Sequence, residues 1–504
     1  MAQTATQEES GHRHCRETNS DMENYPLNHY QAAAYSGEVA DFWAIPPTER
    51  QPILLEAIAQ THSWHYERNP AYRRLVESRG VGPQLDVGTA ERRSFSDLRS
   101  DLASVLRPTA QTFKSYISVI GTPFPQRRPV AFLEWLADQL SIDLPRERFR
   151  QFKQRYPSLE KLLQDFEAIF DDFGFEVTTS SGTSGRATIM VRDRETVNLA
   201  VSCFVETTLG IWGVGREHYA IFMMPRETRI AMARTALFGS QRLGMQEEGR
   251  AHFTIPFPAD PDRVRIRTGR TFQPGWHGRL ERHLGHPFAR WMDERYVQPR
   301  AISQTITLLE QAERLGAPTL LFGSLIQLHA LSHRLRTLGY GQNSRRMRLP
   351  AGSLVGTGGG LKQFYPFSPT QIRQDIEALL TLESGEPVPI RDVMGMAEAN
   401  WAAPQCEVGN YHLPPWVYAV ALDDDDRILS GVDVVGLLAF LDPLGGGRLF
   451  PSFFKTTDQV ELINGANAYE PTYRCPCGRD TPYIVQGTIR RVDLLEEAGC
   501  AGQL

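Results

Sequence analysis

Apolar residues recur at intervals of three and four along two stretches, 53–76 and 130–170. This spacing places them on one face of an amphipathic helix, so both stretches are predicted to be helical. Further along, short apolar runs of strand length alternate with helical repeats, and this alternation is typical of parallel strands joined by helical crossovers. Strands are expected at 175–179, 218–224, 318–322 and 354–356, with helices at 193–210, 229–238, 304–315 and 326–338.

The pattern changes after Gly395, where apolar runs follow one another without helical repeats between them. An acidic run at 423–426 separates the first two, and we interpret it as a solvated hairpin tip rather than a metal site. The sequence therefore predicts an α/β fold in which mixed sheets are flanked by helices and the carboxyl-terminal third is β-rich. In that third, strands are expected at 416–422, 428–430, 434–441 and 460–463.

Composition narrows the functional classes. The chain has 504 residues, 41% hydrophobic and 22% charged, which suits a protein with a large core. A net charge of -5 argues against nucleic acid as a partner, although arginines cluster at 263–300 and 345–348. We interpret those clusters as solvated faces or ion-pair partners rather than as a polyanion site.

No run of about 18 apolar residues occurs, so no membrane span is expected. Residues 1–40 are polar and lack the order of a signal peptide, which predicts a flexible amino-terminal arm. Six unevenly spaced cysteines do not suit a disulfide scaffold and favour a reducing, cytoplasmic setting.

A loop rich in glycine and hydroxyl side chains follows the strand predicted at 175–179. Glycine lets the backbone approach an anion closely, and exposed amides and hydroxyls can donate to phosphate oxygens. The composition alone also suits an ordinary loop, and the order of residues matches neither GxxxxGK[ST] nor GxGxxG. The candidate phosphate ligands are Ser180, Ser181, Gly182, Thr183, Ser184 and Gly185.

The residue order Ser180-Ser-Gly-Thr-Ser-Gly-Arg-Ala-Thr188 resembles the phosphate-binding signature of adenylate-forming enzymes. Within that superfamily it is most similar to phenylacetate-CoA ligases and to LuxE-type acyl-protein synthetases. Three further segments follow in the order of the family: Gly358-Gly359-Gly360-Leu-Lys362, Met394-Gly-Met396-Ala-Glu398 and Phe454-Lys-Thr-Thr-Asp458. The resemblance covers roughly residues 50–490 and implies an adenylation domain over 41–487.

The resemblance implies an enzyme that uses ATP to activate a carboxylic acid as acyl-AMP and passes the acyl group to a thiol or amine, with a partner protein as one candidate acceptor. Thr183 and its neighbours would bind phosphates, Glu398 would hold magnesium, and Asp458 would bind ribose. Lys362 would contact phosphate or the substrate carboxylate. Gly358, Gly359, Gly360 and Met396 would line the nucleotide site. The alternatives are an acyl- or aryl-CoA ligase and a non-catalytic nucleotide-binding partner protein.

Two departures from the family pattern concern the carboxyl terminus. By the resemblance, we expect a short tail at 488–504 in place of the family's mobile C-terminal domain and its catalytic lysine. The hinge is irregular, so either Arg490 or Arg491 would take the place of the arginine that contacts ribose. Cys500 resembles the acyl-carrying cysteine of LuxE-type enzymes, and the alternative is an exposed tail cysteine.

Three cysteines and one histidine have the spacing of a metal site: Cys406 and His412 lie six apart, and Cys475 and Cys477 form a short knuckle. Three thiolates and one imidazole would bind a structural zinc with no open position, clamping the β-rich third. The alternative is unrelated free cysteines beside a surface histidine. Candidate residues for the acid pocket are aromatics near strand ends, which are more often core residues: Trp212, Phe222, Phe322 and Tyr365.

Overall fold

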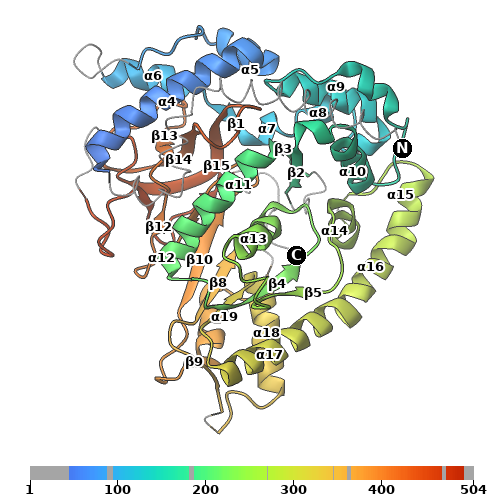
Figure 1. The fold of residues 1–504 in the computed structure, drawn as a ribbon, viewed down its shortest axis with the longest axis vertical. Coiled ribbons are helices and arrows are strands. Elements are labelled where there is room, and N and C mark those ends of the chain that lie inside the picture. Colours follow the sequence, from blue (N-terminus) through green and yellow to red (C-terminus); the bar gives the residue numbers. More distant parts are fainter. Residues whose placement is uncertain are drawn as a thin grey trace, which may run out of the picture.

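The computed structural model describes residues 45–87, 95–180, 187–269, 271–343, 345–359, 365–467 and 473–492. Two large sheets dominate these residues, and Figure 1 shows one in the lower half of the molecule and the other beneath the amino-terminal helices. The predicted α/β architecture with mixed sheets and a β-rich carboxyl-terminal third is confirmed. The predicted arm at 1–40 lies outside the described residues.

The six-stranded sheet has the order β11-β10-β8-β6-β4-β5. Its strands run parallel except β11, which is antiparallel to β10. The predicted strands at 218–224, 318–322 and 354–356 are confirmed, and they form the centre of the sheet. Each is buried on both faces, which explains why each is a continuous apolar run in the sequence. The strands are β4 (Tyr219–Pro225), β5 (Ala251–Ile255), β6 (Thr319–Phe322), β8 (Leu354–Gly358), β10 (Ile390–Gly395) and β11 (Ala402–Pro404).

Helices cover both faces of this sheet. On one face, α17 (Gln298–Leu315), α18 (Leu325–Thr337) and α19 (Pro369–Glu377) bury their apolar sides in one core cluster. On the other face, α12 (Gly210–Trp212) and α13 (Ala231–Arg242) form a second cluster. A small parallel pair, β7 (Met347–Leu349) and β9 (Leu380–Leu382), completes this half.

Three of the aromatics that we considered for an acid pocket belong to the second cluster. Trp212, Phe222 and Phe322 are buried near one another, with tilted rings whose centroids are 6.4 and 6.5 Å apart for the pairs that share Phe322. Tyr365 lies apart from them, on the side of α18, where its hydroxyl is 2.6 Å from His329 Nδ1. Trp212, Phe222 and Phe322 are therefore core residues on one face of the six-stranded sheet.

The seven-stranded sheet lies in the carboxyl-terminal third, with the path β12-β16-β15-β14-β13 and with β1 and β17 also paired to β15. The predicted strands at 416–422 and 434–441 are confirmed, whereas residues 428–430 form only an isolated bridge from Ile428 to Leu422. The strands are β1 (Arg107–Pro108), β12 (Tyr411–His412), β13 (Tyr418–Leu422), β14 (Asp433–Asp442), β15 (Ser452–Ile463), β16 (Tyr483–Ile484) and β17 (Arg490–Arg491).

Amino-terminal helices cover this sheet and share its core cluster (Figure 1). The helix predicted at 53–76 is divided at Asn69, whose side chain accepts from the amide of Tyr72 at 2.9 Å and caps a new helix that starts with Pro70. The helices are α4 (Pro47–Arg68), α5 (Pro70–Glu77), α6 (Phe95–Ser104), α7 (Thr109–Thr112), α8 (Tyr116–Ile120), α9 (Pro129–Gln139) and α10 (Leu159–Ile169).

A hairpin of β2 (Phe175–Thr179) and β3 (Ile189–Asp193) belongs to neither large sheet. Arg229 holds the first of its strands in place. Its guanidinium makes paired hydrogen bonds of 2.6 Å to Glu167 and of 3.0 Å to Glu160 on α10, and Nη1 donates to the carbonyl of Val177 at 3.2 Å. The carbonyl of Arg229 accepts from the amide of Thr179 at 2.7 Å. The loop that follows Thr179 therefore starts from a braced position.

Substitution of Arg229 by Met should lower the free energy of unfolding by about 3 kcal/mol, because two glutamates lose the charge that compensates them. Denaturant unfolding monitored by circular dichroism measures this. The control is Arg146→Met, which removes an exposed ion pair with Glu134 and should cost less than about 1 kcal/mol. Equal losses in the two variants would contradict the bracing role.

Candidate active site and metal centre

The carboxyl ends of β8 and β10 meet at one edge of the six-stranded sheet. The two strands are parallel, with Gly358 opposite Val393. In parallel sheets ligands bind at this edge. Gly358 leaves little room, since a Cβ there would lie 3.1 Å from the Val393 side chain, and Gly359 has a φ of +83°, which favours glycine. Gly360 and Lys362 lie outside the described residues.

The end of β10 carries Met394, and the segment that follows the strand carries Met396 and Glu398. Both methionines pack against the core of the seven-stranded sheet, so this segment lies where the two sheets meet. The carboxylate of Glu398 accepts a hydrogen bond of 3.0 Å at Oε1 from the Thr188 hydroxyl. No described residue donates to its Oε2, so this oxygen can bind a cation.

The candidate phosphate loop connects β2 to β3. Its base is closed by two hydrogen bonds: the amide of Ser180 donates to the carbonyl of Thr188 at 3.1 Å, and the amide of Thr188 donates to Ser180 Oγ at 2.9 Å. The remaining predicted ligands, 181–185 with Thr183 among them, lie outside the described residues. The ends of the loop are thus fixed beside Glu398 by the contact through Thr188.

A second contact joins the hairpin to the same segment. Arg192 on β3 is buried, and its guanidinium donates to the carbonyl of Glu398 at 3.0 Å, of Ala397 at 3.4 Å and of Gly445 at 3.1 Å. Burial lowers the Arg192 pKa to about 10, and the nearby carboxylates of Asp442, Glu398 and Asp193 oppose that shift. Arg192 belongs to none of the sequence motifs, although a single arginine inside the apolar run of β3 is an unusual feature of the sequence.

Asp458 lies in β15, opposite Arg491 of β17. The Nε of Arg491 is 4.0 Å from Oδ1 of Asp458, at the outer limit of an ion pair. Arg490 lies opposite Gln459 instead, and its side chain is exposed. Since successive side chains of a strand point to opposite faces, Arg490 and Arg491 cannot both face Asp458. Of the two arginines left open by the sequence, Arg491 is therefore the one that lies beside Asp458.

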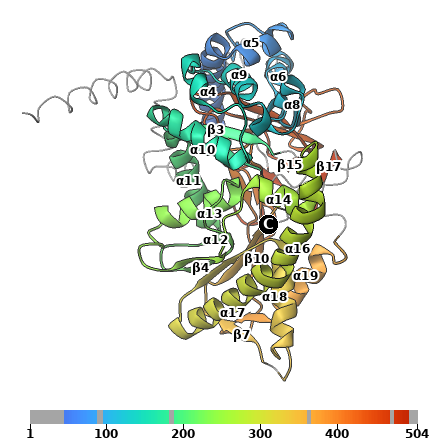
Figure 2. The ribbon, with the colours of Figure 1, turned by 90° about the vertical axis from the view of Figure 1, so that its right-hand side faces the viewer.

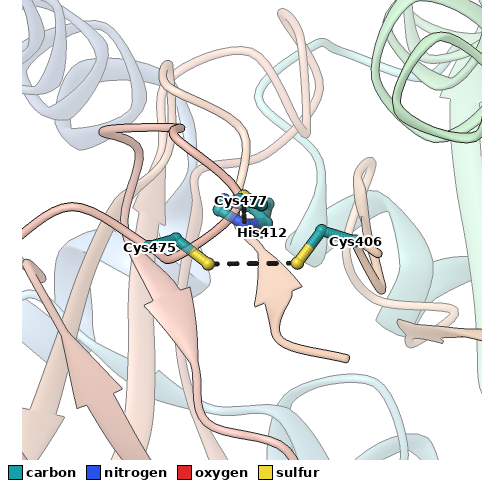
Figure 3. A group of neighbouring side chains, drawn as sticks. All are labelled: Cys406, His412, Cys475 and Cys477. Atoms are coloured by element: carbon teal, nitrogen blue, oxygen red, sulfur yellow. Dashed lines mark hydrogen bonds between the residues drawn. The ribbon is translucent and has the colours of Figure 1, made fainter. Parts of the chain in front are cut away.

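The predicted metal ligands come together. The candidate ligand atoms of Cys406, His412, Cys475 and Cys477 all lie within 4.8 Å of one another, and Figure 3 shows the Cys406 and Cys475 sulfurs pointing toward each other. The sulfurs of Cys406 and Cys475 are 3.9 Å apart, too far for a disulfide. Two thiolates on one tetrahedral zinc at about 2.3 Å would lie about 3.8 Å apart, so the donors fit that ion.

The surroundings orient these donors. The Nδ1 of His412 lies 2.8 Å from the Thr481 hydroxyl, which leaves Nε2 facing Cys477 Sγ at 3.3 Å. Burial lowers the His412 pKa to about 4, so the imidazole is neutral and can act as a ligand. The Nδ2 of Asn410 donates to Cys475 Sγ at 3.4 Å. Hydrogen bonds of this kind around the ligands are typical of protein metal sites.

The cluster also joins the two sheets. Cys406 follows β11 of the six-stranded sheet, whereas His412 lies in β12 and the other two cysteines precede β16 of the seven-stranded sheet. Two tight turns present the cysteines, with Gly409 at a φ of +89° and Gly478 at +90°. Cys500 and the rest of the tail after residue 492 lie outside the described residues.

Comparisons with known proteins agree with this architecture. The family model described as acyl-protein synthetase, LuxE, matches residues 289–504. A long-chain-fatty-acid–luciferin-component ligase of Aliivibrio fischeri is 28% identical over 147 residues, 29% of this chain. The match spans only 35% of that protein's length.

Among solved structures, an open conformation of 2-hydroxyisobutyryl-CoA ligase in complex with 2-HIB-AMP and CoA has a TM-score of 0.53 at 16% identity, covering 89% of this chain and 76% of that one. The same ligase in the postadenylation state, in complex with 2-HIB-AMP, has a TM-score of 0.51 at 16% identity, with 89% and 69% covered.

Asp442, at the end of β14 in the region around Arg192, makes the stability of the fold depend on pH. Burial raises its pKa from 3.8 to about 7, and its Oδ2 has no hydrogen-bond partner among the described residues. The folded state therefore holds this proton more tightly than the unfolded state. The stability that this provides is complete below about pH 4 and is lost as the pH rises through about 7.

In the wild type, this carboxyl should make the free energy of unfolding decline by up to about 1.4 kcal/mol per pH unit between pH 4 and 7, and Asp442→Asn should remove that decline. Urea unfolding at a series of pH values measures the slope. Asp433→Asn, an exposed substitution on the same strand, should keep the wild-type slope, because that carboxylate stays in water on folding. An unchanged slope in Asp442→Asn would exclude the buried carboxyl as its source.

The fold class expected from the sequence is confirmed, because the chain shares the fold of 2-hydroxyisobutyryl-CoA ligase, and the expected resemblance to LuxE acyl-protein synthetases is confirmed as a similarity over residues 289–504.

Proposed function

We propose that this chain uses ATP to activate a carboxylic acid as acyl-AMP and then transfers the acyl group to a thiol or an amine. The observation that carries the proposal is the hydrogen bond from Thr188, at the end of the glycine loop, to Glu398, in the segment that follows β10. It joins a loop suited to phosphate with a carboxylate suited to a cation. The family match and the fold shared with a ligase crystallised with acyl-AMP support the same chemistry.

In the first step a carboxylate oxygen attacks the α-phosphorus of ATP, and pyrophosphate leaves. Negative charge on the phosphate oxygens grows in the transition state, so fixed donors aimed at them lower the barrier. The loop 180–185, including Thr183, supplies those donors in the proposal. Glu398 Oε2 would hold Mg²⁺, which would neutralise phosphate charge when bound. Asp458 would accept hydrogen bonds from the ribose hydroxyls, with Arg491 beside it.

In the second step the acceptor attacks the acyl carbon, AMP leaves, and the acceptor's proton passes to solvent. The acceptor is a thiol or amine, and Cys500 is the candidate within the chain. Lys362 is the candidate for contact with phosphate or the substrate carboxylate. Transfer of the acyl group from acyl-AMP to the thiol of coenzyme A, which forms a thioester and releases AMP, is the second candidate function, favoured by the fold shared with a ligase crystallised with CoA. A nucleotide-binding partner without catalysis is the remaining alternative.

Glu398→Gln should lower ATP–pyrophosphate exchange by about 100-fold or more, because it removes charge at the developing phosphate centre. Exchange is measured with a panel of short, aromatic and long-chain acids, and ATP binding is measured alongside it. Glu383→Gln, on an exposed turn directly after β9, is the matched control. ATP binding by the wild type without exchange for any acid would reject both enzyme functions and favour the non-catalytic partner.

We further propose that Cys406, His412, Cys475 and Cys477 hold one structural zinc ion. The set offers three sulfurs and one nitrogen in contact range, which is a closed coordination sphere with no site for substrate. Zinc would thereby fasten β11 to the β12–β16 pair and stabilise the junction of the two sheets.

The purified chain should contain one zinc per molecule by elemental mass spectrometry. Cys475→Ser should lose it and lower the melting temperature by roughly 5 °C or more, because the folded state loses a ligand that the unfolded state binds weakly. The control is Cys203→Ser, at a buried thiol outside the cluster, which should keep the metal. Metal-free wild-type protein with an unaltered melting temperature after Cys475→Ser would reject the site.

A further inference from the structure

A single long helical stretch runs along one margin of the molecule (Figures 1 and 2). It consists of α15 (Trp276–Leu280), a π-helical turn (Glu281–Gly285), α16 (His286–Met292), a second π-helical turn (Asp293–Val297) and α17, with no break between them. One side of its first half packs against α14 (Pro261–Thr268). There Arg265 pairs with Glu281 at 2.8 Å, and His286 Nδ1 lies 2.9 Å from the carbonyl of Ile266.

The opposite side of the helix carries large apolar residues in water. They form what we call the apolar stripe: Trp276, Leu280, Leu284, Phe288 and Trp291, which are 60, 45, 65, 62 and 49% exposed. The spacing of four, four, four and three residues puts them on one face. A π-helical turn holds more residues than an α-helical turn, which keeps positions four apart aligned along the axis. Contiguous apolar surface of this kind marks a site of interaction.

Positive charge borders the apolar stripe. Arg279, Arg282, Arg295 and Arg300 make no ion pair with any described residue, whereas the three acids between residues 276 and 300 are all paired. Glu281 binds Arg265, Asp293 binds Arg267 at 3.2 Å, and Glu294 binds Arg290 at 2.6 Å. The exposed side of the helix therefore combines aromatic and aliphatic side chains with arginines whose charge has no counterpart in the described part of the chain.

The arginines beside the apolar stripe indicate which kind of partner can cover it. A second copy related by two-fold symmetry would place the same arginines against one another, and such like-charge contact is costly. An anionic surface would complement them. The stripe lies on a single convex helix at the margin of the molecule, which suits a plane better than it suits a groove. Helices with Trp, Phe and Leu on one side and arginines beside them lie in the interface of anionic bilayers.

We propose that the apolar stripe and its arginine border bind the surface of an anionic lipid bilayer, with the helix parallel to the bilayer plane. Insertion across the bilayer is not involved, since none of the described helices combines the length and apolar character that a span requires. The apolar side chains would enter the boundary between headgroups and acyl chains, and the arginines would contact lipid phosphates. The proposal does not depend on the adenylation activity.

Co-sedimentation of the full chain with vesicles tests this. The wild type should bind vesicles of phosphatidylcholine and phosphatidylglycerol in equal parts, bind pure phosphatidylcholine less, and dissociate as salt is raised. Leu284→Ser/Phe288→Ser should weaken binding about tenfold or more, because two large side chains no longer enter the interface. Val119→Ser/Leu315→Ser, at residues 64 and 61% exposed but outside the stripe, should bind as the wild type.

Arg279→Gln/Arg295→Gln should reduce binding to the anionic vesicles, whereas Arg346→Gln/Arg348→Gln, at exposed arginines elsewhere, should not. All variants should keep the wild-type melting temperature and the exchange activity without vesicles, which separates this proposal from that of the active site. Absence of wild-type binding, or unweakened binding by Leu284→Ser/Phe288→Ser, overturns it. So does self-association of the wild type, in sedimentation velocity, that Leu284→Ser/Phe288→Ser abolishes, because a second copy would then cover the stripe.

Discussion

The buried guanidinium of Arg192 is the contact on which the arrangement of the candidate site depends. A charge taken out of water must be met by oxygens at close range, or the fold loses several kcal/mol. Arg192 finds them in the carbonyls of Ala397, Glu398 and Gly445, and the nearby carboxylate of Asp442 also favours its charged form. Arg192 thereby fixes the position of the β2–β3 hairpin relative to both sheets.

The same reasoning explains how much of the fold could be predicted from sequence. The strands β4, β6 and β8 were predictable because each is buried on both faces and forms a short apolar run between helical repeats. β15 was recognised only at its end, because its middle carries Lys455, Thr457, Asp458 and Gln459. Such a polar stretch lacks the alternation of apolar and polar residues that predicts a strand. In the structure it is nevertheless part of the strand, because both of its ends pair with β14.

The candidate site was predictable where a residue type is rare or its order is specific. The thiols and imidazole of the cluster could be grouped from spacing alone, since few other functions need that set. Arg491 could not be preferred over Arg490, because the choice depends on strand register, and a shift of one residue turns a side chain to the other face. The helix that carries the apolar stripe was missed for a related reason. Its glycines and Pro287 suggest loops, and its apolar residues face water rather than a core.

The way the amino-terminal helices cover the carboxyl-terminal sheet has a consequence for the synthesis of the chain. Trp64 donates to the carbonyl of Arg448, 384 positions later, and β1 pairs with β15. At about 5–20 residues per second, the first helices leave the ribosome roughly 20 to 80 seconds before the strands that bury them exist. During that interval their apolar faces need another cover, so the nascent chain is a natural client for chaperones that shield such surfaces.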